Sequence, residues 1–322
     1  MVGLCEGIRA PPCVSRADTE PTTTVVVRPG PNEPRSVGLV DRCAESRPGP
    51  WSGVGTVSLV NDLWTYRGLV GNLAQRELKA RYKRSVLGWV WSLVNPASTL
   101  AIYAIVFGTL LKVKPPVQVN GSINSFAMFL FCGLVVWNFF NSVLLGSMNS
   151  LIAAGPLLKK VYFPAECAPA ANLLVALSQA AIESSILIVL FIAFGNAAFT
   201  MLLVPVIIVL LAVFTFGIGL VLSVANVYLR DVAYLVAVLL NLLFYATPIV
   251  YPESILKGHP TIQTIVTLNP VNQFVRAMRE CTYLLVWPSI GQLAALTAVS
   301  AGTFLIGWFV FRRFGSTVSE EL

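Results

Sequence analysis

The chain has 322 residues, of which 56% are hydrophobic and 11% charged, and its mean hydropathy is +0.75. This composition excludes an ordinary soluble domain and predicts an integral membrane protein. The formal net charge is +7. Because the excess bases lie at 61–84, directly before a long apolar run, they indicate contact with anionic lipid head groups and argue against nucleic acid. The six cysteines show no CxxC spacing, so no metal site or disulfide framework is expected.

Residues 1–60 are rich in Pro, Gly, Thr and Arg and contain no apolar run long enough for a signal peptide. We expect a disordered cytoplasmic extension; a start codon assigned too far upstream is the alternative interpretation. Residues 61–84 are expected to form a basic amphipathic helix that lies flat on the inner leaflet. The alternative is a solvated helix packed on the protein. Apolar residues recur at every fourth position of this segment, namely Val70, Ala74, Leu78 and Tyr82.

Six apolar segments follow, each suited to a membrane span of about 20 residues. Residues 85–111 carry no charged side chain, and a basic cluster that ends at Arg84 precedes them. With both termini inside, the cytoplasmic segments hold 17 of the 22 Lys and Arg residues, as the positive-inside rule requires. We therefore predict an all-α membrane domain at 85–315 with six transmembrane helices, followed by a short cytoplasmic tail at 316–322. The spans are predicted at 93–111, 126–154, 170–194, 198–227, 232–251 and 290–311.

The segment 252–288, between the fifth and sixth predicted spans, is broken by prolines and only partly apolar. We expect it to lie on the outer side and to re-enter the membrane, where irregular backbone is tolerated only against protein or water. Arg276 and Arg279 fall on one helical face and could bind phosphate. However, Glu280 lies four residues after Arg276, and an ion pair between these two is the favoured interpretation.

Polar residues interrupt two of the predicted spans. Glu183 lies near the middle of the third span, where a charged carboxylate would cost a few kcal/mol. We expect a hydrogen-bonded contact within the helix bundle, with a role in conduction or conformational change as the alternative. One face of the second span carries a polar stripe that is expected to pack against a neighbouring helix, with contact to a hydroxyl-rich cargo as the alternative. This face consists of Asn138, Ser142, Leu145 and Asn149.

Five ordered motifs carry a resemblance to a known family. They are ELKARYKRSVLGWVW at 77–91 with NP at 95–96, LLKKVYFP at 157–164, GIGL at 217–220 with Ser223, Asn226 and the Arg230-Asp231 pair, FYATPIVYP at 244–252, and LNP at 268–270. Together they resemble the permease subunits of type-2 ABC exporters of O-antigen, teichoic-acid and cell-wall polysaccharides. The resemblance covers residues 72–311. It is specific for the family but not for the cargo.

The resemblance implies that two copies of this chain form the pathway and that two copies of a separate ATPase drive it with ATP and Mg²⁺. The chain has no GxxxxGK[ST] phosphate-binding loop, and we expect no enzymatic activity, catalytic residue, metal or cofactor in it. The inner loop after the second span is the expected docking site for the ATPase, with a positive-inside anchor as the alternative. The expected coupling residues are Glu77, Arg81, Leu158, Lys159, Lys160, Val161, Tyr162 and Phe163.

In the family, the first and fifth spans border the pathway, and aromatic rings suit the apolar faces of sugars. We therefore expect an aromatic pathway wall, although packing is the alternative for any one of its residues, and an outer gate in the segment 252–288. The wall residues are Tyr103, Phe107, Phe244 and Tyr245, and the gate residues are Asn269, Pro270, Arg276 and Arg279.

The expected function is export of a polyprenyl-diphosphate-linked polysaccharide, either O-antigen or cell-wall galactan, across the plasma membrane of a bacterium. One alternative is an exporter of a drug or small lipid. Another is a membrane enzyme that acts on polyprenyl-linked sugars, but the sequence has no cluster of Asp, Glu or His at the membrane face to form a catalytic set.

Overall fold

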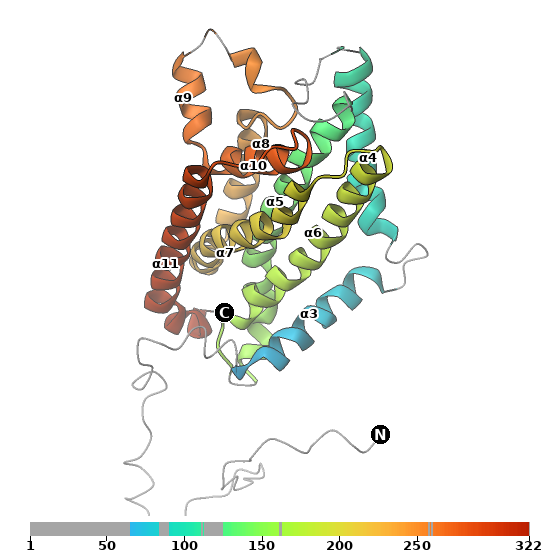
Figure 1. The fold of residues 1–322 in the computed structure, drawn as a ribbon. Helices are drawn as coiled ribbons and strands as arrows, with labels where there is room; N and C mark the ends of the chain where they lie inside the picture. Colours follow the sequence, from blue (N-terminus) through green and yellow to red (C-terminus); the bar gives the residue numbers. More distant parts are fainter. Residues whose placement is uncertain are drawn as a thin grey trace, which may run out of the picture. The chain divides into compact units, whose positions relative to one another are not determined.

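The computed structural model of this chain describes residues 65–83, 90–110, 112, 125–160, 163–256, 258 and 260–321. All of the regular structure in these residues is helical, as the composition predicts. The described helices belong to a compact unit that runs from Val54 to Leu322, and Figure 1 shows their arrangement. The predicted disorder of residues 1–60 falls outside the described residues and stays a prediction.

Among the described residues, four helices are long and apolar enough to cross a membrane. They are α5 (Phe126–Leu158), α6 (Cys167–Ala193), the segment formed by η3 (Phe199–Leu203) and α7 (Val204–Tyr228), and α11 (Ile290–Glu321). Two shorter apolar helices occupy the first and fifth predicted spans. They are α4 (Trp91–Tyr103), which continues as the π-helical η2 (Ala104–Leu110), and α8 (Val232–Ala246). The all-helical membrane fold is thus confirmed, while the count of six spans stays a prediction.

Helix α8 ends at Ala246, earlier than the predicted boundary at 251. The next residue, Thr247, has an extended backbone with φ −93° and ψ 132°, because the ring of Pro248 disfavours helical backbone at the residue before it. The 15 residues of α8 measure about 22 Å. This helix is therefore shorter than the hydrocarbon core of a bilayer, which is about 30 Å thick.

Helix α5 forms the centre of the bundle, where it packs against α6, α7 and α10 (Pro270–Thr282). Helix α11 packs closely along α7. A Cβ atom on Gly217 would overlap the backbone of Thr303, and a Cβ atom on Gly307 would overlap the carbonyl group of Gly217. The two backbones can approach this closely only because glycine has no side chain.

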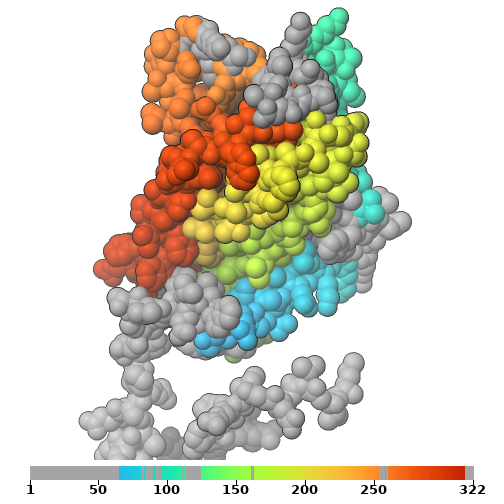
Figure 2. Space-filling view, in the orientation of Figure 1, coloured from blue at the N-terminus to red at the C-terminus, as the bar shows by residue number. Residues whose placement is uncertain are grey.

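The outward faces of α6 and α7 form a continuous surface between α3 (Arg67–Tyr82) and the end of the bundle that carries α10 (Figure 2). Soluble proteins rarely expose apolar patches of this kind, so the surface suits contact with lipid. Its exposed apolar side chains include Leu174, Val189, Ile192, Val206 and Val209.

Helix α3 packs against α6, at the end of the bundle opposite α9 (Pro260–Leu268) and α10 (Figure 1). Val70 and Ala74 are buried in a cluster with Leu151 and Phe163, while Arg76 and other basic residues of the helix are exposed. The apolar face of α3 thus packs on the protein, as in the alternative interpretation. Its predicted place on the inner leaflet stays a prediction.

The outer segment, named by the predicted topology, contains η4 (Glu253–Leu256), α9 and α10. Val266 is the buried residue of α9, so this helix lies at the surface. Most residues of α10 are buried, and Phe274, Val275 and Met278 are completely buried. The backbone at this end is therefore held against protein, whereas re-entry into the membrane stays a prediction.

Candidate coupling region and translocation surface

The inner loop between α5 and α6 carries two exposed lysines and packs on the protein through apolar contacts. Lys159 and Lys160 are exposed, and their backbone N–H groups donate to the carbonyls of Gly155 (3.1 Å) and Leu157 (3.0 Å) at the end of α5. Phe163 is buried in the cluster that contains Val70 and Ala74 of α3. The predicted coupling residues Val161 and Tyr162, and the side chain of Arg81, lie outside the described residues.

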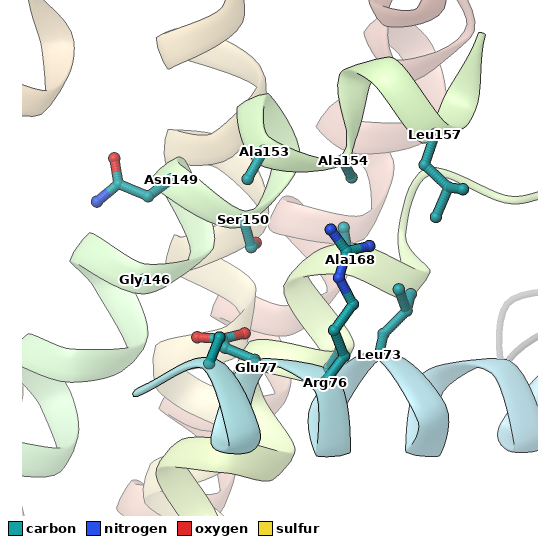
Figure 3. Close-up of a pocket in the computed structure, with 12 residues that line it drawn as sticks. Leu73, Arg76, Glu77, Gly146, Asn149, Ser150, Ala153, Ala154, Leu157 and Ala168 are labelled. Atoms are coloured by element: carbon teal, nitrogen blue, oxygen red, sulfur yellow. The ribbon is translucent and has the colours of Figure 1, made fainter. Parts of the chain in front are cut away.

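A pocket of about 390 Å³ lies between α3, α5 and α6 (Figure 3). Arg76 and Glu77 extend from α3 toward the two membrane helices, and Asn149 and Ser150 of α5 supply further polar atoms. Most of the other residues on the α5 and α6 walls are small, so side chains do not fill the space between the helices. Helix α3 is therefore not close-packed against α5 at this point. The small wall residues are Gly146, Ala153, Ala154, Ala168 and Ala171.

The structure brings the four predicted wall residues into one aromatic cluster. The ring centroids of Tyr103 and Phe107 are 6.0 Å apart, those of Tyr103 and Phe244 are 5.9 Å apart, and those of Phe244 and Tyr245 are 5.2 Å apart. These distances are typical of favourable aromatic pairs. Phe244 is buried and also contacts Trp137 at 5.3 Å. Tyr245 is 64% exposed, so it supplies most of the open aromatic surface.

Helix α8 buries only a narrow stripe of its surface, formed by Val236, Leu240 and Phe244. A helix that is apolar on all sides is normally covered on all sides, by lipid or by another chain. The remaining faces of α8 are open in the single chain. Their exposed side chains are Tyr234, Leu235, Val238, Leu239, Leu242 and Tyr245.

The predicted gate residues take different places around α10. Asn269 caps this helix, because its Oδ1 accepts from the backbone N–H of Val271 at 3.0 Å, and Pro270 occupies the first turn, where its missing N–H costs nothing. Arg276 pairs with Glu280 at 3.3 Å, which confirms the favoured interpretation. Arg279 is buried. The two arginines therefore do not form the common anion-binding face that their spacing allowed.

Glu183 makes the predicted contact within the bundle. Its carboxyl accepts hydrogen bonds from Gln179 Nε2 at 2.9 Å and from Asn138 Nδ2 at 3.4 Å. Asn138 belongs to the polar stripe of α5, so one member of the stripe packs against α6 as expected. Asn149, further along the same stripe, instead lines the pocket beside α3.

Residues 69–283 match the sequence profile of the ABC-2 type transporter family, from α3 to the end of α10. The chain belongs to this family. It is 32% identical over 245 residues to the O-antigen export system permease protein RfbA of Myxococcus xanthus, covering 76% of this chain and 91% of the relative. It is 30% identical over 210 residues to RfbA of Klebsiella pneumoniae, with 65% and 77% covered. It is 26% identical over 244 residues to the polysialic acid transport protein KpsM of Escherichia coli, with 74% and 90% covered.

The family match covers the inner loop, the pocket, the aromatic cluster and α10, and it confirms the resemblance drawn from the motifs. Sequence reasoning missed the pocket, because small side chains such as Gly146 and Ala168 give no chemical signal of their own. It also missed two aromatic residues of α5, namely Trp137, whose ring contacts Phe244, and Phe129, whose ring lies 5.6 Å from that of Tyr283. The spacing of aromatic residues along α5 could have suggested that these rings meet those of other helices, but not which ones.

Proposed function

We propose that this ABC-2 type permease is the membrane subunit of an ATP-driven exporter that carries a lipid-linked polysaccharide from the cytoplasm across the plasma membrane. The observation that carries this proposal is the aromatic cluster of Tyr103, Phe107, Phe244 and Tyr245, in a chain whose relatives are named as permeases for O-antigen and polysialic acid. Aromatic rings can support the apolar faces of a moving sugar chain without binding any one sugar tightly, at about 1 kcal/mol for each contact.

Two copies of a separate ATPase, which hold ATP and Mg²⁺, would dock at the inner loop of two permease copies. Lys159 and Lys160 offer exposed positive charge for an acidic partner surface. When the ATPases close on ATP, the loop would move, and Phe163 would transmit this movement to α3. The unfilled pocket beneath α3 gives this helix room to shift.

The second copy of the chain would cover the open apolar face of α8 and leave a pathway between the two permeases. The sugar chain would pass along the aromatic cluster, while the polyprenyl tail remains in lipid. We propose polyprenyl diphosphate as the lipid carrier and O-antigen or cell-wall galactan as the polymer, with both termini of the permease in the cytoplasm.

Depletion of this permease in its native bacterium tests the proposal. The surface polysaccharide should decrease while the lipid-linked polymer accumulates inside the cell. The wild-type gene should restore export, and a Lys159→Glu, Lys160→Glu variant should insert normally but restore little, because acidic residues would repel the partner surface. Unchanged surface polysaccharide after depletion would instead support export of a drug or small lipid.

A further inference from the structure

The guanidinium of Arg279 lies inside the protein at the junction of α10, α5 and the turn after α8. Its Nη1 donates to the carbonyl of Pro248 and its Nη2 to the carbonyl of Ile249, both at 2.7 Å. The guanidinium carbon lies 3.7 Å from the ring centroid of Phe129. Only 7% of the residue is exposed. One side chain of α10 thus holds two consecutive peptide groups at the end of α8 against α5.

Burying a guanidinium costs free energy, because the charge loses its contact with water. Among the described residues no carboxylate lies within ion-pair distance of Arg279, and its Nε has no hydrogen-bond partner. The guanidinium donates to two carbonyls of buried residues, which would lose these donors without it. The charge thereby holds the turn in one position relative to α10.

Neighbouring residues hold the same turn and leave room for the guanidinium. Asn269, which caps α10, donates from Nδ2 to Thr247 Oγ1 at 2.9 Å, so a second side chain of the outer segment reaches the turn. On α5, a Cβ atom at Gly133 would lie only 3.0 Å from Nη2 of Arg279 and 3.3 Å from Cγ2 of Ile249. A larger residue at this position would crowd both the guanidinium and the turn.

The turn directly follows the aromatic residues Phe244 and Tyr245. At the inner end of α8, the backbone N–H of Ala233 donates to Asn226 Oδ1 at 3.1 Å, and between the two ends the helix is attached by its narrow buried stripe. Arg279 and Asn269 are therefore the side chains whose polar contacts fix the outer end of α8. We propose that Arg279 is a positioning residue that fastens the outer end of α8 to α10 and keeps the translocation pathway closed in the resting transporter. This inference rests on the proposed export function, because it assigns a closed state to that pathway.

The test measures leakage of radiolabelled sucrose from proteoliposomes that contain the full-length permease with its ATPase, without ATP and without polysaccharide. Arg279→Met should release sucrose at least about tenfold faster than the wild type, since a hydrogen bond to a charged group shifts such an equilibrium by that factor or more. Arg279→Lys keeps the positive charge but loses the planar fork that donates to two carbonyls, so its leakage should be intermediate. Arg313→Met, at an exposed position of α11, is the matched control and should leak as the wild type does.

Gly133→Ala keeps the charge but crowds the guanidinium, so it should also raise leakage. Its control is Gly302→Ala, because a Cβ atom there meets nothing within 4 Å. If Arg279→Met does not assemble with the ATPase, the Gly133→Ala result decides. Sucrose release at the wild-type rate in the assembled variants would overturn the inference. If Arg279→Met leaks but the wild type exports no polysaccharide, the proposed function fails while the positioning role stands.

Discussion

Replacing Glu183 by leucine should destabilise the protein by about 2 kcal/mol, through one hydrogen bond within α6 and one between α5 and α6. The residue is 3% exposed and accepts hydrogen bonds from Gln179 Nε2 at 2.9 Å and Asn138 Nδ2 at 3.4 Å. Leucine accepts neither bond, and each buried donor that loses its acceptor costs about 1–3 kcal/mol. The low end of that range applies, because both amides are partly exposed and the longer bond is weak.

A second substitution separates this hydrogen-bond effect from a change in packing. In the wild type, Asn138→Leu removes a donor from the Glu183 carboxyl and should destabilise the protein slightly. In the Glu183→Leu background the same substitution removes an amide that has lost its acceptor, so it should stabilise the protein. The effect of one substitution therefore changes sign with its partner, as expected for directly interacting residues.

The assay is thermal unfolding of the purified permease in detergent, for the wild type, both single variants and the double variant. The predicted order of melting temperature places Glu183→Leu lowest and the double variant above it. Glu183→Gln should lie near the wild type, because its amide oxygen still accepts one bond. If Glu183→Leu melts with the wild type, or if Asn138→Leu has the same effect in both backgrounds, the carboxyl does not join α5 to α6.

Three further predictions concern the regions around this bundle. Replacing Tyr103 and Phe107 together by alanine should leave insertion and ATPase pairing intact but slow polymer export, as measured by surface polysaccharide, because the pathway loses aromatic surface. Single-cysteine probes should label from inside at Lys159 and from outside at Lys257, as read with a membrane-impermeant maleimide. Asn269→Ala should destabilise the protein by about 1 kcal/mol, as measured by thermal unfolding, through loss of the α10 cap.

Each of these predictions has an outcome that contradicts it. Normal export by the Tyr103→Ala, Phe107→Ala variant would show that these residues do not form the pathway wall. Loss of the folded protein would show that both residues serve core packing instead. Ile105→Ala, at an exposed position of η2, is the control for export. Reversed labelling would invert the topology. An unchanged melting temperature for Asn269→Ala would mean that the first turn of α10 is stable without its cap.

Local signals in the sequence predicted the helices well. Runs without charge located α5, α6 and α7 to within a few residues. They also located the start of α11, but this helix continues to Glu321, ten residues beyond the predicted end at 311. The spacing of Val70 and Ala74, four residues apart, identified the buried face of α3. These signals are short in range, because helical periodicity relates residues only three or four positions apart. The pair of Arg276 with Glu280 was predictable for the same reason.

Contacts between distant segments were not predictable in the same way. Periodicity placed Arg279 beside Arg276, but the partners of its guanidinium are carbonyls of Pro248 and Ile249, which carry no side-chain signal in the sequence. Gly133 lies beside that guanidinium. It belongs to an apolar run, and nothing in the sequence distinguishes this glycine from the other small residues of the spans. Tertiary packing, rather than local propensity, decides these positions.

Transport into inside-out membrane vesicles tests the central claim most directly. Vesicles that contain the permease and its ATPase would receive a lipid-linked polysaccharide from outside, and polymer protected from an added glycosidase would be measured with and without ATP. The account predicts that protected polymer accumulates only when ATP, the ATPase and the permease are all present. Equal protection without ATP, or none with the complete system, would contradict it.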